Sequence, residues 1–217
     1  MGQGAWEIPK SVLCAILHVE HVPFAWAMHL RRLQVPGPVI GLTGMPFDHA
    51  RNAACQKALE IGVDFLYFVD SDVITPPDVI HRLMAHRLPI VSGLYNRRSP
   101  PAGVPVMIKN GSWVTTLPDP NKGESSLVEV DLVGAGCLLI QTSVLRDMPP
   151  QEPGKHWFNW QVDKGGTSED FTFNIHAKKT LGISTYVDTS VRCKHIGLSE
   201  YHYQAVQPLD YNFSALG

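Results

Sequence analysis

Two carboxylates stand one residue apart at the end of an apolar stretch. Residues 65–72 read Phe-Leu-Tyr-Phe-Val-Asp-Ser-Asp, and the aromatic-rich run predicts a buried strand. Residues i and i+2 of an extended chain point to the same side, so Asp70 and Asp72 should lie together where the strand ends. Such carboxylates repel each other near a dry core unless a cation offsets their charge. Mg²⁺ or Mn²⁺ suits oxygen ligands; the alternative is a turn that only caps the next helix.

Two later motifs carry groups that could act beside such a cation. Residues 167–170, Thr-Ser-Glu-Asp, precede a helical pattern, and residues 192–195, Arg-Cys-Lys-His, follow a strand-like run. A carboxylate such as Asp170, or its neighbour Glu169, can take a proton from a hydroxyl group. Each motif also has an ordinary explanation, because acidic residues favour any helix start and His195 is one of 10 histidines.

The bulk composition is that of a globular chain. The 217 residues are 44% hydrophobic and 18% charged, with a formal net charge of −2, which suits a single domain with a sizeable core. The charge gives no basic footprint for nucleic acid, and we expect neither a transmembrane segment nor a signal peptide. The widely spaced cysteines favour reduced core thiols and a cytoplasmic protein; they are Cys14, Cys55, Cys137 and Cys193.

The first half of the chain alternates strand-like and helix-like patterns. The expected strands are 11–18, 39–42, 65–69 and 89–94, and the expected helices are 23–33, 48–61 and 75–84. Asp48 suits an N-cap and Gly62 a helix stop. This order predicts an α/β protein with a Rossmann-like, mostly parallel central sheet flanked by helices. Ligands bind beyond the carboxyl ends of such strands.

The second half predicts a smaller, mixed sheet and a late helix. The expected elements are a hairpin at 104–116 around Asn110-Gly111, one or two strands at 127–141, a long loop at 148–166 and a strand at 183–191. Ser168 should cap a helix that ends at Gly182. Residues 134–136, Gly-Ala-Gly, interrupt the strand region, where small residues either let a ligand such as a sugar approach the backbone or mark a bulge or tight packing.

Taken in this order, the three motifs resemble those of the metal-dependent nucleotide-sugar glycosyltransferases of the GT-A fold, particularly the large inverting family two. The resemblance spans residues 12–197 and implies one domain, 1–217. Within it, 11–96 would bind the nucleotide sugar, 97–197 would form the acceptor and catalytic half, and 198–217 would be a tail.

The resemblance also implies a role for each candidate residue. Asp72 would hold Mn²⁺ or Mg²⁺ on the donor diphosphate, and Asp70 would reach the ribose or a metal-bound water. His195 would complete the metal site. Asp170 would deprotonate the acceptor hydroxyl, with Glu169 beside it. Arg51 would meet the donor phosphate or base, unless it is a plain exposed arginine.

Departures from the family pattern affect which donor base and which type of sugar transfer we expect. The first strand lacks a Pro-Thr-Tyr-Asn-like ending, so the base is not fixed; a UDP-sugar is expected before a GDP-sugar. No Gln-x-x-Arg-Trp stretch follows the acidic pair, which favours transfer of a single sugar over processive synthesis. Trp157 and Trp160 precede the pair instead, where they could stack on a sugar, close over the donor or belong to the core.

We therefore expect a metal-dependent glycosyltransferase that inverts the sugar, with an acceptor that the sequence does not identify. A retaining transferase would share the Asp-x-Asp motif. A nucleotidyltransferase would predict a glycine-rich basic loop after the first strand, and residues 17–22, Leu-His-Val-Glu-His-Val, are not one. A sugar-nucleotide-binding module without chemistry would need no base at Asp170.

Overall fold

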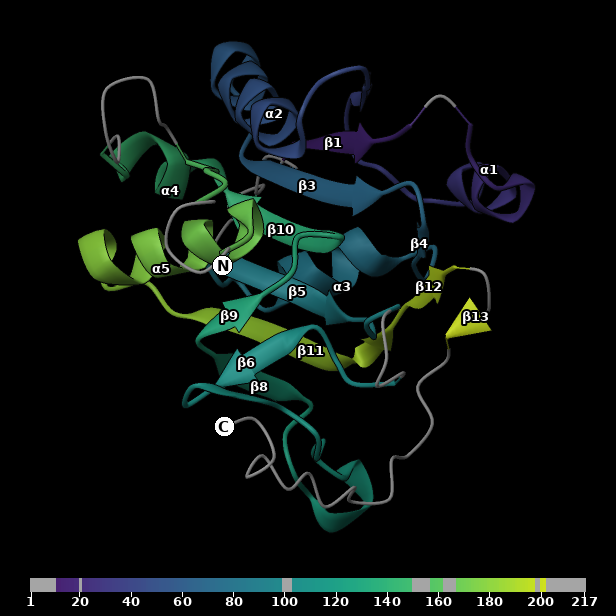
Figure 1. Cartoon of the computed structure of the whole chain (residues 1–217), viewed down its shortest axis with the longest axis vertical. Coiled ribbons are helices and arrows are strands. Elements are labelled where there is room, and N and C mark those ends of the chain that lie inside the picture. The colour runs from purple at the N-terminus through teal and green to yellow at the C-terminus, as the bar shows by residue number, and fades with distance from the viewer. Residues whose placement is uncertain are drawn as a thin grey trace, which may run out of the picture.

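A central seven-stranded sheet organises the chain (Figure 1). The computed structural model describes residues 11–19, 21–98, 103–149, 157–161, 167–197 and 200–201. The strand order is β2-β1-β3-β10-β5-β11-β8. In that order the strands are Val39–Leu42, Val12–Leu17, Phe65–Asp70, Cys137–Gln141, Ile90–Leu94, Thr185–Arg192 and Leu127–Val130.

The sheet is mixed, so the expectation of a mostly parallel sheet holds only in part. β1 pairs in parallel with β2 and β3, and β5 pairs in parallel with β11. β10 lies antiparallel between β3 and β5, and β8 lies antiparallel on β11. Both reversed strands come from the second half of the chain. Hydrophobic periodicity predicts that a strand exists but not its direction, and for this reason the reversal could not be predicted.

Helices cover both faces of the sheet. They are α1 (Phe24–Leu30), α2 (Phe47–Ile61), α3 (Val79–Ala85), α4 (Thr142–Asp147) and α5 (Glu169–Leu181), with a 3₁₀ turn at Pro120–Lys122. Side chains of β3 alternate between two cores. Phe68 packs in the core with α2, α4 and α5, whereas Tyr67 packs in the core with α1 and α3. Burying a side chain such as Phe68 stabilises the fold by roughly 1.5–3 kcal/mol.

Two small antiparallel sheets flank the central one. The first has the order β7-β6-β9, formed by Ser112–Trp113, Met107–Lys109 and Leu132–Val133. The second has the order β13-β12-β4, formed by Glu200–Tyr201, Lys194–Ile196 and Val73–Ile74. The expected smaller sheet therefore exists, but its pairings are antiparallel and not mixed. The second small sheet lies at the end toward which the β3 and β5 arrows point in Figure 1.

Several local predictions are confirmed, the Asp48 cap is wrong, and the Ser168 cap is right in position only. Gly62 and Gly182 end their helices in the left-handed conformation, with φ of 73° and 68°. Asn110 and Gly111 turn the β6–β7 hairpin with positive φ. Asp48 is not an N-cap, because α2 already begins after Pro46. Ser168 occupies the N-cap of α5, but its hydroxyl donates to Asp170 and does not cap the helix backbone.

Some predictions fall partly beyond the described residues. In the expected loop 148–166, residues 150–156 and 162–166 lie outside them, and in the expected tail only Glu200–Tyr201 is described. Among the helices that are described, none is both long enough and apolar enough to cross a bilayer.

Candidate functional site

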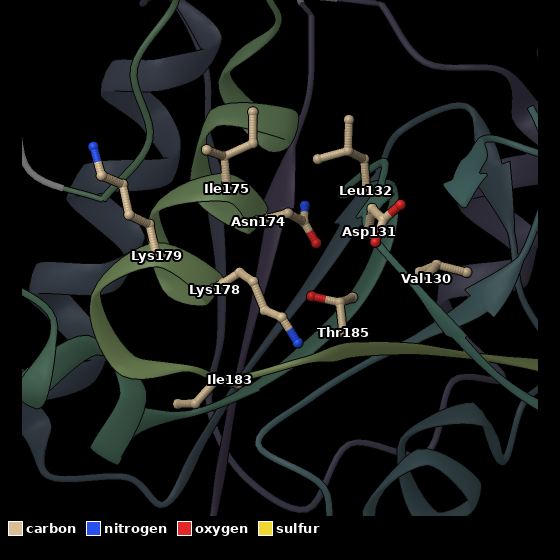
Figure 2. A pocket seen from close by; sticks show the side chains of 9 residues that line it. All are labelled: Val130, Asp131, Leu132, Asn174, Ile175, Lys178, Lys179, Ile183 and Thr185. Atoms are coloured by element: carbon tan, nitrogen blue, oxygen red, sulfur yellow. The ribbon is translucent and has the colours of Figure 1, made fainter. Parts of the chain in front are cut away.

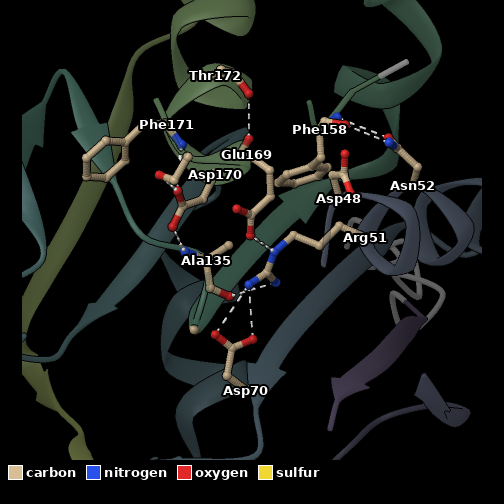
Figure 3. A network of polar contacts seen from close by, with 12 residues as sticks. Asp48, Arg51, Asn52, Asp70, Ala135, Phe158, Glu169, Asp170, Phe171 and Thr172 are labelled. Atoms are coloured by element: carbon tan, nitrogen blue, oxygen red, sulfur yellow. Dashed lines mark hydrogen bonds and ion pairs between the residues drawn. The ribbon is translucent and has the colours of Figure 1, made fainter. Parts of the chain in front are cut away.

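A buried arginine joins two of the predicted acidic positions (Figure 3). Arg51 projects from α2, and its side chain is 3% exposed. Its Nε donates to Glu169 Oε1 at 3.0 Å, and its Nη2 donates to both oxygens of Asp70 at 3.1 and 3.3 Å. Its Nη1 donates to the Ala135 carbonyl at 3.4 Å. One guanidinium thus connects α2, the end of β3, the start of α5 and the turn before β10.

Charge and burial oppose each other in this network. Burial raises the pKa of Asp70, and the nearby Arg51 charge partly offsets that effect while Asp72 adds to it. Burial likewise raises the pKa of Glu169, again offset in part by Arg51 and increased by Asp170. Burial by itself would lower the pKa of Arg51, but the surrounding carboxylates outweigh it and raise the pKa. The guanidinium therefore stays charged, and its charge favours the ionised form of two carboxylates that burial by itself would tend to protonate.

Backbone contacts fix where Asp70 stands. The Asp70 amide donates to the Gly136 carbonyl at 3.2 Å, and the Ser71 amide donates to the Leu17 carbonyl at 3.0 Å. The indole of Trp26 donates to the Asp70 carbonyl at 3.0 Å. These contacts hold the strand end from both neighbouring strands and from α1. The Asp70 side chain keeps 29% of its surface exposed, so this carboxylate faces both Arg51 and solvent.

Asp170 lies in the first turn of α5, next to this network. Its Oδ1 accepts from the Phe171 amide at 2.8 Å and from the Ser168 hydroxyl. Its Oδ2 accepts from the Ala135 amide at 3.3 Å. A carboxylate has about four lone-pair sites, so three donors leave room for one more. Asp170 is half-buried, so part of this residue is in contact with solvent.

Asp72 and His195 meet because a late strand returns to the Asp-Ser-Asp turn. In the β4–β12 pairing His195 lies opposite Val73, and the Ile196 amide donates to the Asp72 carbonyl at 2.7 Å. His195 Nε2 then lies 3.5 Å from Asp72 Oδ1, and Arg98 Nη1 lies 2.9 Å from Asp72 Oδ2. Burial would raise the pKa of Asp72, but His195 and Arg98 outweigh it and hold the pKa below its usual value.

The other nitrogen of His195 fixes the chemistry of this pair. His195 Nδ1 lies 2.7 Å from the Asn96 carbonyl oxygen, which can only accept, so Nδ1 carries the proton. In a neutral imidazole, Nε2 then presents a lone pair to the Asp72 carboxylate. Two acceptors that face each other in this way require a proton or a cation between them. A backbone carbonyl behind a histidine is also the usual support of a metal-ligating imidazole.

The fit to a divalent cation is partial. Asp72 and His195 supply a carboxylate and an imidazole, while both oxygens of Asp70 are directed at Arg51. Within the described residues, no group of three or more histidine, cysteine, aspartate or glutamate side chains could hold a metal ion. Two protein ligands still suit Mg²⁺ or Mn²⁺, because such ions are commonly bound through one or two carboxylates together with substrate phosphates.

The glycines before β10 are needed for packing. A Cβ at Gly134 would lie 2.1 Å from the Tyr95 hydroxyl oxygen, and one at Gly136 would lie 3.1 Å from Tyr95 Cζ. The Gly136 amide donates to the Tyr95 hydroxyl at 2.9 Å. Tyr95 therefore occupies the space that a sugar was expected to approach. The alternative for residues 134–136, close internal packing, is the arrangement observed.

The two tryptophans before α5 differ in their surroundings. Trp157 is half-buried and its indole donates to the Leu145 carbonyl at 2.8 Å. Asn52 holds this segment, since its Oδ1 accepts from the Trp157 and Phe158 amides at 3.1 and 3.0 Å. Trp160 is 50% exposed. Of the two, only Trp160 offers much ring surface for stacking.

A separate cavity of about 280 Å³ lies between the later turns of α5 and the β8–β9 corner (Figure 2). None of the predicted site residues lines it. Asn174, which does, is 1% exposed and donates through Nδ2 to the Asp170 carbonyl at 2.6 Å. The predicted site residues thus gather elsewhere, at the strand ends. The lining residues are Val130, Asp131, Leu132, Asn174, Ile175, Lys178, Lys179, Ile183 and Thr185.

Three participants in the site were not predicted from the sequence. Tyr95 and Asn96 directly follow β5, and Arg98 lies two residues later. Their contacts arise because β5 ends beside β10 and β11. The basic pair Arg97-Arg98 was the one visible clue, and by itself it does not indicate which carboxylate it meets.

The comparisons with known proteins support the fold alone. No family model matches the chain, and neither does any curated protein. Among solved structures, the chain is similar to the crystal structure of A197 from STIV, a viral protein. The TM-score is 0.64 at 15% identity, and the match covers 93% of this chain and 99% of that one. At this identity the likeness extends to the α/β architecture and not to an activity.

Proposed function

We propose that this chain is a metal-dependent glycosyltransferase of the GT-A fold that moves one sugar from a nucleotide-sugar donor to an acceptor hydroxyl. The observation that carries the proposal is the bridge from Arg51 to Asp70 and Glu169. It joins an acidic strand end to an acidic helix start through a guanidinium that is only 3% exposed. His195 and Asp72 stand at the same strand end. Asp72 and Asp170 are close enough to raise the pKa of Asp70, so more carboxylates gather here than the two that pair with Arg51.

Asp72 and His195 are the residues that would hold Mn²⁺ or Mg²⁺, with the diphosphate of the donor as further ligand. A divalent ion there supplies positive charge where the leaving diphosphate develops negative charge. Asp70 is restrained by Arg51, which suits a carboxylate that positions the ribose or a metal-bound water. We expect a UDP-sugar as donor, because nothing in the site contradicts that part of the resemblance.

Asp170 is the proposed general base. An alcohol is a weak nucleophile unless a carboxylate within hydrogen-bond reach takes its proton. The Ser168 hydroxyl and the Phe171 and Ala135 amides hold the Asp170 carboxylate in place. Such preorganisation keeps the base oriented toward an incoming hydroxyl. A base opposite the leaving diphosphate implies a single displacement, and hence inversion at the anomeric carbon.

Glu169 and Arg51 are proposed as positioning residues. Glu169 is buried, and Arg51 occupies one of its oxygens, so Glu169 holds the helix start and does not take the proton. Arg51 is equally enclosed, and contact with a donor phosphate would require it to leave two carboxylates. We therefore propose that Arg51 fixes the position of the start of α5 relative to Asp70 at the end of β3.

Thermal denaturation with nucleotide sugars tests the proposal. A ligand that binds the native state raises the melting temperature, so a UDP-sugar should raise it with Mn²⁺ and far less without Mn²⁺. Asp72→Ala should remove that metal-dependent shift while leaving the apo protein folded. An Asp72→Ala protein that keeps the full metal-dependent shift would remove Asp72 from the donor site. Absence of a shift with UDP- and GDP-sugars alike would contradict the proposed function.

A further inference from the structure

Arg98 pairs with the carboxylate of Asp72, which is the group that would bind the proposed cation. Its Nη1 lies 2.9 Å from Asp72 Oδ2, while His195 faces the other oxygen of the same carboxylate at 3.5 Å. The Arg98 side chain is 52% exposed, so it can leave this position at little cost in packing. Its neighbour Arg97 is placed differently, with its guanidinium carbon 4.7 Å from the centre of the Trp113 ring.

The arrangement sets Arg98 and a divalent cation in competition. Both neutralise the same carboxylate, and a cation that enters beside Arg98 meets a like charge a few ångströms away. A diphosphate changes this balance. It brings negative charge to the cation, and a guanidinium binds phosphate oxygens with paired, charge-assisted hydrogen bonds. Arg98 then gains a new partner close to the one it leaves.

We propose that Arg98 is a mobile diphosphate-binding residue: it pairs with Asp72 when no cation is bound and transfers to the donor diphosphate when the cation arrives. This inference rests on the proposed function, because it takes the cation to bind at Asp72. Its consequence is coupled binding. The cation binds weakly alone and tightly with the diphosphate, and by linkage each ligand raises the affinity for the other by the same factor.

Electron paramagnetic resonance of free Mn²⁺ measures this coupling without any turnover. Mn²⁺ is titrated into the apo protein with and without saturating UDP, and the ratio of the two dissociation constants is the coupling factor. Arg98→Gln is the test variant. Arg97→Gln is the matched control, because it removes the same charge one residue away.

The two variants should behave differently. In Arg98→Gln, Mn²⁺ alone should bind about two- to five-fold more tightly, as expected for removal of an exposed ion pair. UDP should bind about ten-fold more weakly in saturating Mn²⁺, since hydrogen bonds to charged groups are stronger than ordinary ones. The coupling factor should therefore fall in Arg98→Gln and stay near the wild-type value in Arg97→Gln.

Two different failures can be told apart. A wild-type coupling factor in Arg98→Gln, or an equal fall in Arg97→Gln, would overturn the role of Arg98 while leaving the metal site in place. If wild-type protein binds no Mn²⁺ with or without UDP, the proposed function fails, and the role of Arg98 falls with it.

Discussion

Arg51 in α2 donates a hydrogen bond of 3.0 Å to Glu169 at the start of α5, 118 residues later in the chain. The same guanidinium holds Asp70 at the end of β3. Its carbon lies 5.2 and 5.9 Å from the centres of the Phe68 and Phe158 rings, so aromatic side chains also surround the charge. This bridge ties the first half of the sheet to the helix that carries the proposed base.

Arg51→Met should test the bridge directly. It leaves the buried Glu169 and the partly buried Asp70 without their cation, and breaking a buried ion pair such as Arg51–Glu169 typically costs about 3–5 kcal/mol. Burial already raises the pKa of Asp70 and Glu169, and loss of Arg51 removes the charge that offsets this rise. Protonation relieves the penalty, so the deficit should be large at pH 7 and smaller at pH 5.

Urea unfolding at the two pH values measures this deficit. Lys57→Met is the matched control, since Lys57 makes an exposed ion pair with Glu60 at 2.8 Å and such pairs contribute little. Arg51→Met combined with Glu169→Gln should recover part of the loss. Equal deficits at pH 7 and pH 5 would show that the carboxylates do not depend on Arg51.

Asp188 should contribute to resistance against acid. Burial would raise its pKa, but hydrogen bonds from Ser190 and His86 outweigh burial and hold the pKa below its ordinary value of 3.8. A carboxyl with a lowered native pKa stabilises the fold above its unfolded pKa and loses that contribution as pH falls through the native one. Asp188→Asn should therefore flatten the fall in unfolding free energy below about pH 4.

Circular dichroism during acid titration, in constant urea, checks this prediction. Asp131→Asn is a suitable control, because Asp131 accepts from the Asn110 amide at an exposed turn. If Asp188→Asn and wild type lose stability in parallel between pH 5 and pH 2, the partners of Asp188 do not stabilise its charge.

His195→Ala should weaken Mn²⁺ binding less severely than Asp72→Ala does. His195 supplies one of the two protein ligands proposed for the cation, so its loss should weaken Mn²⁺ binding while the Asp72 carboxylate still attracts the ion. His176→Ala is the control, since His176 contacts the Pro149 carbonyl on the exposed side of α5. Identical Mn²⁺ titrations for His195→Ala and wild type would show that His195 is not a ligand of the cation.

Local residue types predicted much of the fold. The apolar run before Asp70 gave β3, and Gly62, Gly182 and the Asn110-Gly111 turn marked ends and turns where left-handed backbone is required. The direction of β10 was not predictable, because an antiparallel insertion depends on the path of the chain and leaves no mark on the strand's own pattern.

The acidic residues and His195 were singled out from the sequence, whereas most of their contacts, including the one from Arg98, were not. Asp72 and His195 were expected near each other, and the β4–β12 pairing brings them within 3.5 Å. The enclosure of Arg51, in contrast, depends on α2, β3 and α5 meeting across long sequence separations. Burial of a charged side chain is the exception among arginines, so an exposed or ligand-facing Arg51 was the natural expectation.

We propose that Asp170 deprotonates the hydroxyl group that attacks a donor held at Asp72. Many transferases pass a sugar slowly to water, so proton NMR of donor hydrolysis reads both the rate and the configuration of the first product. With a UDP-sugar and Mn²⁺, we expect a product of inverted anomeric configuration. Asp170→Asn should slow its release by about 10²–10⁴-fold, with UDP affinity nearly unchanged. A product of retained configuration, released at the wild-type rate by Asp170→Asn, would contradict the account.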